Sequence, residues 1–324
     1  MRRAIAVPAY LLLAAMLLLT IARLSDTRSA AVVGVAAFAS YAVLGYAVAL
    51  VVLLALARRR AGRAPAVLAA LVAAAGLVVH AAWWVPAWTS APVGDATGSA
   101  YTVVSANLEF GRGDPDEVVR LVEAERPALL VLQEVTPSAM TALDRAGIAD
   151  RLPHRAGEPT PGVRGTVVLS RWPLGRVAPD FDLGNGALQV PVAAPVPFVL
   201  LAVHAAMPLA SAPAWHADLD RLRERVARLR DRPLLVVGDL NATTGHAPLR
   251  DVLDAGVRDA AEQAGSGWEP TWPTQYRRPW LRPVLALDHV LVGESTVATA
   301  TRTVTVTGTD HRALVVRLQA RGER

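Results

Sequence analysis

Three long apolar runs at the start of the chain place the strongest constraint on its fold. They cover residues 4–22, 30–57 and 66–87, and the third contains His80 as its one ionisable side chain. A helix of about 20 apolar residues spans the hydrocarbon core of a bilayer, whereas a central arginine would cost roughly 3 kcal/mol to insert. The runs therefore predict three transmembrane helices in a membrane domain over residues 1–88. The first run could also be a cleaved signal peptide, although it is long for one and two more runs follow.

The arginines around these runs predict their orientation. Arg2 and Arg3 precede the first run, and four arginines lie within residues 58–63, between the second and third runs. Because positive charge is retained in the cytoplasm, the N-terminus is expected to be cytoplasmic and everything after Trp88 to be outside. The sequence thus predicts a multi-pass protein of the cell membrane. Its expected partner is the lipid bilayer, and no obligate protein partner is evident.

The rest of the chain reads as a linker followed by one large domain. Residues 89–99 are rich in Ser, Gly, Pro and Ala, and residues 100–324 are enough for one sizeable core. Cysteine is absent, which excludes disulfides and thiolate metal sites. Every basic residue is arginine, as expected from a coding bias, so the net charge of +5 is weak support for a nucleic-acid partner.

Predicted strands in the C-terminal domain end in polar side chains, and predicted helices separate several of them. One helix begins at Pro115, with Asp114 and Glu117 as capping residues, and another covers residues 212–230. In an extended segment, residues i and i+2 face the same side. A polar end of this kind fits either a solvated turn or a catalytic group at a strand end. The strand-end residues are Asn107, Glu109, Gln133, Glu134, His204, Asp239 and Asn241.

Two Asp-His dipeptides lie within or just before apolar strands. They are Asp288-His289 and Asp310-His311. A charge inside an apolar segment must be paired or ligated to be tolerated, and capping does not account for two such pairs in one domain. Several carboxylates close together also form the oxygen-rich environment that a hard divalent cation needs.

A loop over residues 265–282 mixes aromatic side chains with arginine. This composition suits bases, sugars or lipid head groups, but it is equally typical of an aromatic plug over a sheet edge. Its members are Trp268, Trp272, Tyr276, Arg277, Arg278, Trp280 and Arg282. Trp272 and Arg282, together with Arg171 from an earlier motif, are the candidate substrate-binding residues.

Several short motifs occur in a fixed order along the C-terminal domain. They are Ala-Asn-Leu-Glu at 106–109, Leu-Gln-Glu at 132–134, Leu-Ser-Arg-Trp-Pro at 169–173, His204, Gly-Asp-Leu-Asn-Ala at 238–242, Leu-Asp-His-Val at 287–290 and Gly-Thr-Asp-His-Arg at 308–312. Together they resemble the endonuclease/exonuclease/phosphatase superfamily, whose fold is shared by pancreatic deoxyribonuclease, abasic-site endonucleases, bacterial sphingomyelinases and inositol polyphosphate 5-phosphatases. The resemblance covers residues 100–324 and not the apolar runs. It implies an α+β fold, a four-layered α/β-β/α sandwich with the site at one rim.

The resemblance implies a magnesium site. Glu134 would be the principal Mg²⁺ ligand, with Asn107 beside it and Asp310 completing the metal environment. Mn²⁺ could take the same place. Two positions depart from the family pattern. Glu109 stands where some members have Asn or Asp, which puts its role in doubt. His289 stands where Tyr is common and is left outside the catalytic set.

The resemblance also implies catalytic roles. Asp239 would orient or deprotonate the attacking water, and Asn241 would hold a phosphate oxygen. His311, its tautomer fixed by Asp288, would bind the phosphate or stabilise the transition state. His204 would contact the phosphate or the leaving oxygen. These groups suit metal-assisted in-line attack of water on phosphorus.

The expected function is therefore that of a membrane-anchored, Mg²⁺-dependent phosphohydrolase. A nuclease-like phosphodiesterase acting on nucleic acid or nucleotides is favoured. A phospholipid or sphingomyelin head-group phosphodiesterase, or a phosphomonoesterase, is the alternative within the superfamily. A catalytically silent, membrane-tethered binding protein is the alternative of a different class.

Overall fold

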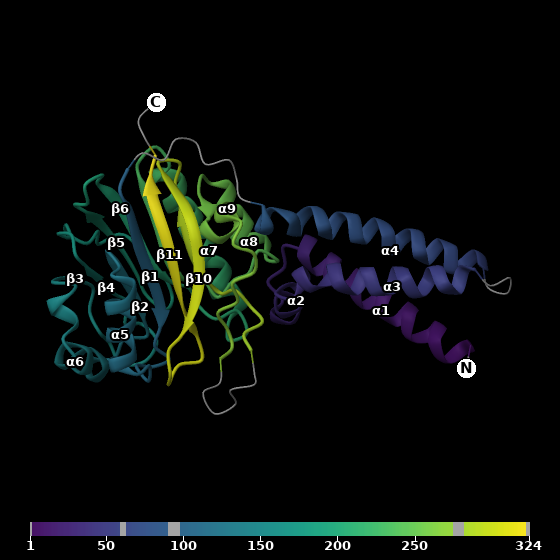
Figure 1. Ribbon diagram of the computed structural model, residues 1–324, viewed down its shortest axis with the longest axis horizontal. Helices are drawn as coiled ribbons and strands as arrows, with labels where there is room; N and C mark the ends of the chain where they lie inside the picture. The colour runs from purple at the N-terminus through teal and green to yellow at the C-terminus, as the bar shows by residue number, and fades with distance from the viewer. Residues whose placement is uncertain (1, 59–62, 90–97, 275–281, 322–324) are drawn as a thin grey trace. The chain divides into compact units, whose positions relative to one another are not determined.

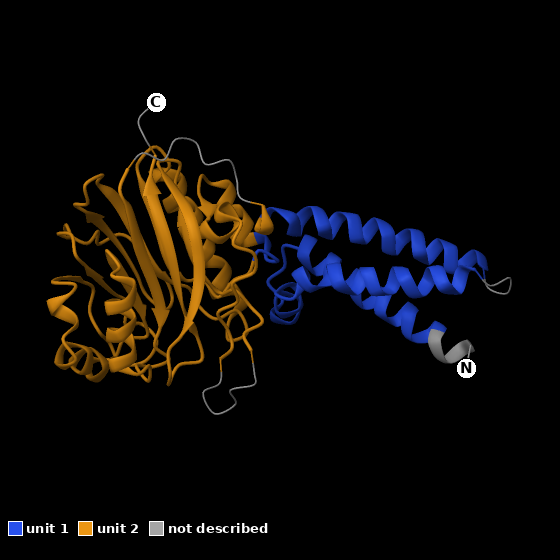
Figure 2. Ribbon diagram, viewed as in Figure 1, with its two compact units in different colours: residues 1–86, 244–247 blue, residues 87–243, 248–324 orange. Residues whose placement is uncertain are grey.

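The computed structural model describes all residues except 1, 59–62, 90–97, 275–281 and 322–324 (Figure 1). The chain divides into two compact units (Figure 2). The N-terminal unit comprises residues 1–86 and 244–247, and the C-terminal unit comprises residues 87–243 and 248–324. Most of the predicted linker and part of the arginine-rich loop at 58–63 lie outside the described residues.

The N-terminal unit is helical. Within the described residues, three segments are long and apolar enough to cross a membrane, namely Ala6–Leu24, Ala39–Ala57 and Arg63–Trp88. The helices are α1 (Arg2–Leu24), α2 (Ala30–Ala36), η1 (Ala39–Tyr41), α3 (Ala42–Ala57), α4 (Arg63–Trp84) and η2 (Val85–Trp88). Three long apolar helices are thus confirmed, but the run over residues 30–57 is not one helix. It is longer than a bilayer requires, and only its second part forms the long apolar segment.

Alanines make up most of the buried interior of this helix group, together with Leu13, Tyr46 and Leu53, while many large apolar side chains are exposed. Ala42, Ala49 and Ala73 are buried between the helices. Large apolar side chains that are more than half exposed include Leu18, Leu44, Val51, Leu68 and Val78. Helices surrounded by lipid pack in this way, because small residues let their backbones approach while large apolar ones face the hydrocarbon.

Two β-sheets form the centre of the described C-terminal unit. Their strand orders are β10-β11-β1-β2-β4-β3 and β5-β6-β7-β9-β8. The strands are β1 (Ala100–Asn107), β2 (Leu129–Gln133), β3 (His154–Ala156), β4 (Val167–Ser170), β5 (Ala187–Val192), β6 (Phe198–His204), β7 (Leu234–Asp239), β8 (Arg258–Asp259), β9 (Asp288–Val292), β10 (Thr296–Thr305) and β11 (Arg312–Ala320). The helices of this part are α5 (Pro115–Glu125), α6 (Pro137–Arg145), η3 (Ile148–Asp150), α7 (Ala212–Leu229), α8 (Ala247–Asp254) and α9 (Ala260–Ala264).

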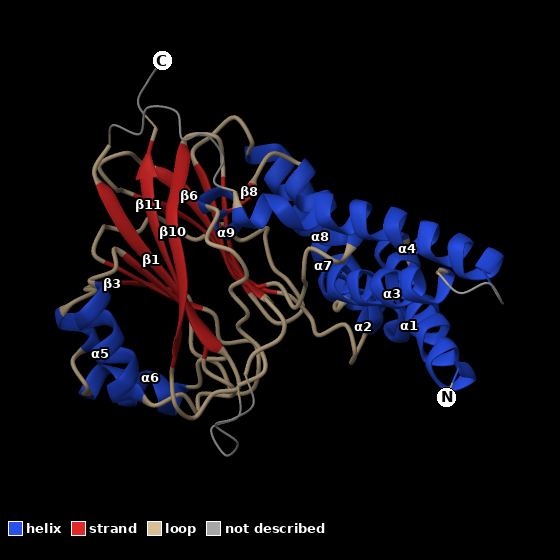
Figure 3. Ribbon diagram, turned by 45° about the vertical axis from the view of Figure 1, so that its right-hand side comes forward, coloured by secondary structure: helices blue, strands red, loops and turns tan. Residues whose placement is uncertain are grey.

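Apolar side chains hold the layers together. Between the sheets, Val131 from one sheet packs in the same core as Leu200 and Val237 from the other. A second core joins α5 and α6 to the outer face of the first sheet, and α7 buries an apolar face of its own. Figure 3 shows α5 and α6 on one side of the strands and α7 on the other. The predicted sandwich of two sheets between helices is confirmed.

The strand directions bring the polar strand ends together. β1 and β2 are parallel, with Asn107 opposite Gln133, and β6 and β7 are parallel, with His204 opposite Asp239. β9 runs antiparallel to β7 and begins with Asp288 opposite Asp239. Because parallel strands end at the same edge, these side chains meet at one end of the sandwich.

The start of α5 follows its sequence signals in part. Asp114 Oδ1 accepts the Glu117 N–H at 2.9 Å, and Pro115 opens the helix. Glu117 does not return a capping bond, because its carboxylate accepts the N–H and hydroxyl of Thr307 at 2.6 and 2.9 Å. Glu117 therefore links α5 to the loop before β11.

Candidate active site

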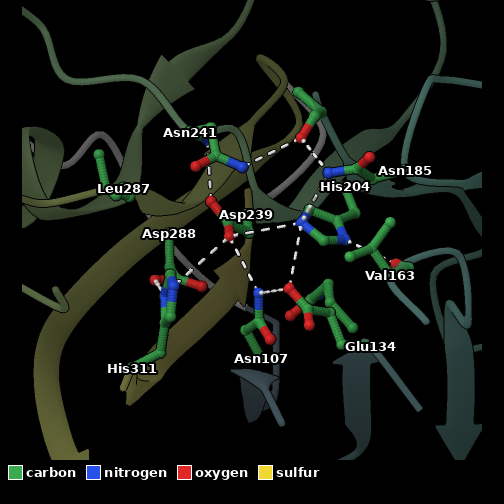
Figure 4. A network of polar contacts seen from close by, with 12 residues as sticks. Asn107, Glu134, Val163, Asn185, His204, Asp239, Asn241, Leu287, Asp288 and His311 are labelled. Atoms are coloured by element: carbon green, nitrogen blue, oxygen red, sulfur yellow. Dashed lines mark hydrogen bonds and ion pairs between the residues drawn. The ribbon is translucent and has the colours of Figure 1, made fainter. Parts of the chain in front are cut away.

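Carboxylates from both sheets meet at the end of β1, β2 and β7 (Figure 4). Asn107 lies between them, and its Nδ2 donates to Glu134 Oε1 and Asp239 Oδ2, each at 3.1 Å. All three side chains are buried. Two acidic groups that are distant in the chain thus share one amide donor.

Two histidines flank Asp239. His204 Nε2 and His311 Nε2 each lie 3.7 Å from Asp239 Oδ2, and His204 Nε2 lies 3.8 Å from Glu134 Oε1. The Nδ1 of His204 lies 3.1 Å from the carbonyl oxygen of Val163. Because a carbonyl only accepts, His204 Nδ1 carries a proton and its Nε2 faces the acids.

Asp288 fixes the ring of His311. The distance from His311 Nδ1 to Asp288 Oδ2 is 2.8 Å. Burial disfavours the imidazolium, but the charges of Asp288 and Asp239 outweigh it and raise the pKa of His311 to about 10. Burial also opposes ionisation of Asp288, yet His311 holds the pKa of Asp288 below its usual value. The pair is therefore an imidazolium and a carboxylate at neutral pH.

The pKa of Asp239 is shifted in the opposite direction from that of Asp288. Its burial and the nearby charge of Asp288 raise the pKa of Asp239, although His311 and His204 act in the other direction. A carboxylate with a raised pKa is a better proton acceptor than a solvated one. The two sides of the site thus differ, with an imidazolium at His311 and a more basic carboxylate at Asp239.

Left-handed backbone occurs in the turn after β1 and at the residue that follows β2. Glu109, Phe110 and Glu134 have φ values of 44°, 56° and 57°, which bulky residues rarely adopt. The Phe110 N–H donates to Glu134 Oε2 at 2.8 Å, and the Glu109 N–H donates to Asn107 Oδ1 at 2.9 Å. The prediction that Asn107 and Glu109 share one face of an extended strand is wrong, because β1 ends at Asn107. The Glu109 carboxylate pairs instead with Arg112 at 2.7 Å.

Asn241 lies beside Asp239, although not as an extended i+2 neighbour. Its φ is 48°, and its N–H donates to Asp239 Oδ1 at 2.8 Å. Its Nδ2 donates to the carbonyl oxygen of Ala205 at 3.0 Å. The turn after β7 therefore brings both side chains to the site.

Asn185 also lies at the site, although it is not among the residues predicted from the sequence. Its Nδ2 donates to the Ala205 carbonyl at 3.1 Å and lies 3.4 Å from His204 Nε2. Buried Asp218 of α7 anchors the same turn by accepting the N–H of Gly184 at 2.9 Å. No local pattern marks Asn185, because it belongs to a turn that only the tertiary fold brings to His204.

Asp310 and Trp272 are directly connected. Trp272 Nε1 donates to Asp310 Oδ2 at 2.9 Å, and Asp310 Oδ1 lies 3.9 Å from His311 Nε2. The backbone N–H of Thr274 donates to the Asp310 carbonyl at 2.6 Å. The indole thus orients an acidic residue at the edge of the site.

The other predicted substrate-binding residues lie elsewhere or outside the described part. Arg171 follows β4, and its N–H donates to the Ala128 carbonyl at the start of β2, the end away from Glu134. Arg282 is exposed. Tyr276, Arg277, Arg278 and Trp280 lie outside the described residues.

The site chemistry fits a divalent cation. Burial first, and then the charge of Asp288, raise the pKa of Asp239, and a cation beside it would favour its carboxylate form. Ligand atoms of Asp239, Asp288 and His311 lie within 4.8 Å of one another, although His311 could serve as a ligand only after losing a proton. Glu134 Oε1 and Asp239 Oδ2 each lie 3.1 Å from Asn107 Nδ2. Carboxylate oxygens suit Mg²⁺. Asn107 could join them only if its amide turned over, because Nδ2 faces the carboxylates.

His289 lies outside this cluster, as expected from the sequence. Its Nδ1 lies 2.6 Å from Asp259 Oδ2 and its Nε2 lies 2.9 Å from the Ala242 carbonyl oxygen. Burial acts against ionisation of both side chains, but their mutual attraction raises the pKa of His289 and lowers the pKa of Asp259. In the Asp288-His289 dipeptide, Asp288 therefore pairs with His311, whereas His289 pairs with Asp259.

The sequence matches one family model. Residues 104–311 match the Endonuclease/Exonuclease/phosphatase family. This segment contains every residue of the cluster around Asp239. No curated protein sequence matches the chain.

Solved structures share the fold of the C-terminal unit at low identity. D. rerio TDP2 complexed with single strand DNA product is 16% identical, with a TM-score of 0.55, over 68% of this chain and 100% of that one. An endonuclease/exonuclease/phosphatase from Bacteroides vulgatus is 14% identical, with a TM-score of 0.53, over 68% and 99%. SmcL is 17% identical, with a TM-score of 0.50, over 68% and 99%.

Proposed function

The chain belongs to the endonuclease/exonuclease/phosphatase family, whose members hydrolyse phosphate esters, and from this premise we propose that it is a membrane-anchored, Mg²⁺-dependent phosphodiesterase. One observation carries the proposal. Asp239 Oδ2 lies 3.7 Å from the Nε2 atoms of both His204 and His311 and 3.1 Å from the amide of Asn107. A base, two imidazoles and an amide donor thus surround one point.

Each side chain then has a role in attack of water on phosphorus. A divalent cation held by Glu134, with Asn107 and Asp310 beside it, would neutralise charge on the phosphate oxygens. Asp239, with its raised pKa, accepts a proton from the attacking water. His311 is an imidazolium and stabilises the charge that develops on the phosphate. His204, whose Nε2 lies 3.7 Å from Asp239 Oδ2, would contact the phosphate or the leaving oxygen.

The favoured substrate is a nucleic-acid or nucleotide phosphodiester. The D. rerio TDP2 structure holds a single strand DNA product, which supports a diester for a site of the same fold. A second candidate is a phospholipid head group. Phe110, Met207 and Leu209 follow β1 and β6 on the side of the site, and their side chains are 48%, 50% and 64% exposed. Exposed apolar groups beside a polar site suit an amphiphilic ester.

The first test is hydrolysis of bis-p-nitrophenyl phosphate by the full chain in detergent micelles. We expect turnover with Mg²⁺ or Mn²⁺ and its loss with EDTA. E134A and D239A should each lower kcat by about 10³-fold or more, because they remove groups that act together. The control is D144N, which changes an exposed carboxylate on α6 that pairs with Arg155. Full activity in E134A and D239A would show that the site is elsewhere.

A substrate panel separates the two candidate esters. Single-stranded DNA, RNA, nucleotide diesters, phospholipid vesicles, sphingomyelin vesicles and simple monoesters are compared by kcat/KM. Preference for the nucleic acids supports the favoured substrate, whereas preference for vesicles that is lost in M207S and L209S supports the lipid candidate.

A further inference from the structure

His289 forms a hydrogen bond with the turn that follows β7. Its Nε2 lies 2.9 Å from the Ala242 carbonyl oxygen and its Nδ1 lies 2.6 Å from Asp259 Oδ2. A carbonyl and a carboxylate both accept hydrogen bonds, so both ring nitrogens donate. Asp259 Oδ1 in turn accepts the Ala261 N–H at 2.8 Å, at the start of α9. His289 is therefore fixed on one side and holds Ala242 on the other.

Trp215 binds the same turn two residues earlier, at Leu240. Its Nε1 donates to the Leu240 carbonyl oxygen at 3.1 Å, and the Leu240 N–H donates to the Leu287 carbonyl at 3.0 Å. The carbonyl groups of Leu240 and Ala242, the residues on either side of Asn241, are thus each bound by a buried side-chain donor. Both Trp215 and His289 are buried.

Asn241, which lies between Leu240 and Ala242, has a left-handed backbone conformation. Asn241 has a φ of 48°, and such a conformation persists where the surroundings fix it. That conformation brings the Asn241 N–H to Asp239 Oδ1 at 2.8 Å and its Nδ2 to the Ala205 carbonyl at 3.0 Å. Losing either carbonyl bond would let the turn relax and move the amide of Asn241.

His289 does not itself belong to the reacting groups. In the β7–β9 ladder it lies opposite Gly238, while Asp288 lies opposite Asp239. Successive residues of a strand face opposite sides. Asp288 therefore faces the cluster with His311, and His289 faces the opposite side of the same sheet, where it contacts Asp259 of the neighbouring strand β8.

We propose that His289 is a positioning residue, which together with Trp215 holds Asn241 in its left-handed conformation so that the Asn241 amide and Asp239 meet the phosphate. This role rests on the proposed function, because it concerns the same site. It adds to that function a support that reaches from α9 through Asp259 and His289 to the turn after β7.

The test is a double-mutant cycle on the full chain in detergent micelles, with bis-p-nitrophenyl phosphate as substrate. H289N places its amide where Nδ1 was and leaves the Ala242 carbonyl unbound, whereas H289Q reaches the position of Nε2. H289N should lower kcat about 10- to 100-fold, as expected for a residue that orients a site group, and H289Q should lose clearly less. In the N241A background, H289N should lower kcat by less than about twofold, because the group that it positions is gone.

Amide hydrogen exchange gives a readout that does not depend on activity. H289N should increase exchange in peptides covering residues 240–243 and leave the peptide covering β1 unchanged. The matched control is S170A, which removes another buried side-chain bond to a backbone group, from the Trp172 N–H to Ser170 Oγ at 2.9 Å. It should lower Tm without changing kcat or exchange at 240–243.

The outcomes separate this role from the proposed function. If the wild-type chain hydrolyses no ester in the panel, the proposed function fails, and exchange at residues 240–243 alone decides whether His289 holds the turn. If the wild type is active, equal loss in H289N and H289Q, additive loss with N241A, or unchanged exchange would each overturn the role. Should H289N not fold, D259N removes the acceptor that fixes the ring and must show the same coupling to Asn241.

Discussion

At the scale of single residues, the site separates two acids by their surroundings. Asp288 contacts an imidazolium, which lowers its pKa, whereas burial and the charge of Asp288 raise the pKa of Asp239. The backbone ladder places these two carboxylates opposite each other. His311 thus stabilises the carboxylate form of Asp288, whereas Asp239 keeps a raised pKa, which favours its accepting a proton.

The first prediction at this scale concerns the pH dependence of activity. The pKa of His311 is raised to about 10, so the stabilisation from its imidazolium is fully present below the unfolded pKa of about 6.5 and is lost as the pH rises through about 10. D288N removes the largest source of this shift. We expect the alkaline limb of kcat to move to lower pH by at least about one unit.

The measurement is kcat against pH for wild type and D288N, with D144N as the control. D144N should leave the alkaline limb in place, because its carboxylate is far from His311. An alkaline limb that is unchanged in D288N would mean that another group sets it. Thermal unfolding of the same proteins should show a lower Tm for D288N than for wild type at a pH between about 6.5 and about 10, the unfolded and folded pKa values of His311.

A second prediction at this scale concerns Trp272. W272F keeps the aromatic ring but removes the donor to Asp310 Oδ2. We expect the Mg²⁺ concentration for half-maximal activity to rise about 10-fold or more, because an acid at the edge of the site loses the group that orients it. A Mg²⁺ titration of activity measures this. An unchanged Mg²⁺ requirement would place Asp310 outside the metal environment.

The site residues that are predicted from sequence and that the fold brings together share one property. Asn107, Glu134, His204 and Asp239 lie at or next to the ends of apolar strands, where a polar side chain needs an explanation. Asn185 and the Val163 carbonyl lie in turns, and their positions depend on contacts with distant segments. Local pattern carries no information about such contacts.

At the scale of elements, the approach of β6 and β7 depends on Gly238. Its φ is 148°, and a Cβ there would lie 1.9 Å from the Val203 carbonyl oxygen. G238A should lower the free energy of unfolding by more than about 2 kcal/mol and reduce activity, since Asp239 is the next residue. The control is G162A, because Gly162 has a φ of 79° but nothing within 4 Å.

Denaturant unfolding distinguishes these two glycines. G162A should cost about 1 kcal/mol from its backbone conformation alone and keep full activity. Equal loss in both variants would show that the close approach of β6 and β7 does not matter. At this scale, strands and long helices follow from apolar periodicity. The turn after β1 does not, because left-handed backbone at Glu109 and Phe110 has no signal in residue type.

At the scale of the whole molecule, the three long apolar helices are confirmed and their orientation stays a prediction. The arginines around them predict a C-terminus outside the cytoplasm. Alkaline phosphatase fused to the C-terminus should therefore be active in cells, whereas the same reporter fused after residue 60 should be inactive. The reverse pattern would put the active site in the cytoplasm and change the substrates that it can meet.

The pairing of β1 with β11 means that the first strand of the C-terminal unit needs the last one to complete its sheet. Ala100 lies opposite Gln319, so the first strand of the C-terminal unit completes its place in the sheet only beside the last one. His311 also arrives just ahead of β11. A polypeptide still emerging from the ribosome holds Asn107 and Glu134 long before it holds these partners. A chain that terminates before β11 therefore lacks part of this sheet and is expected to be inactive.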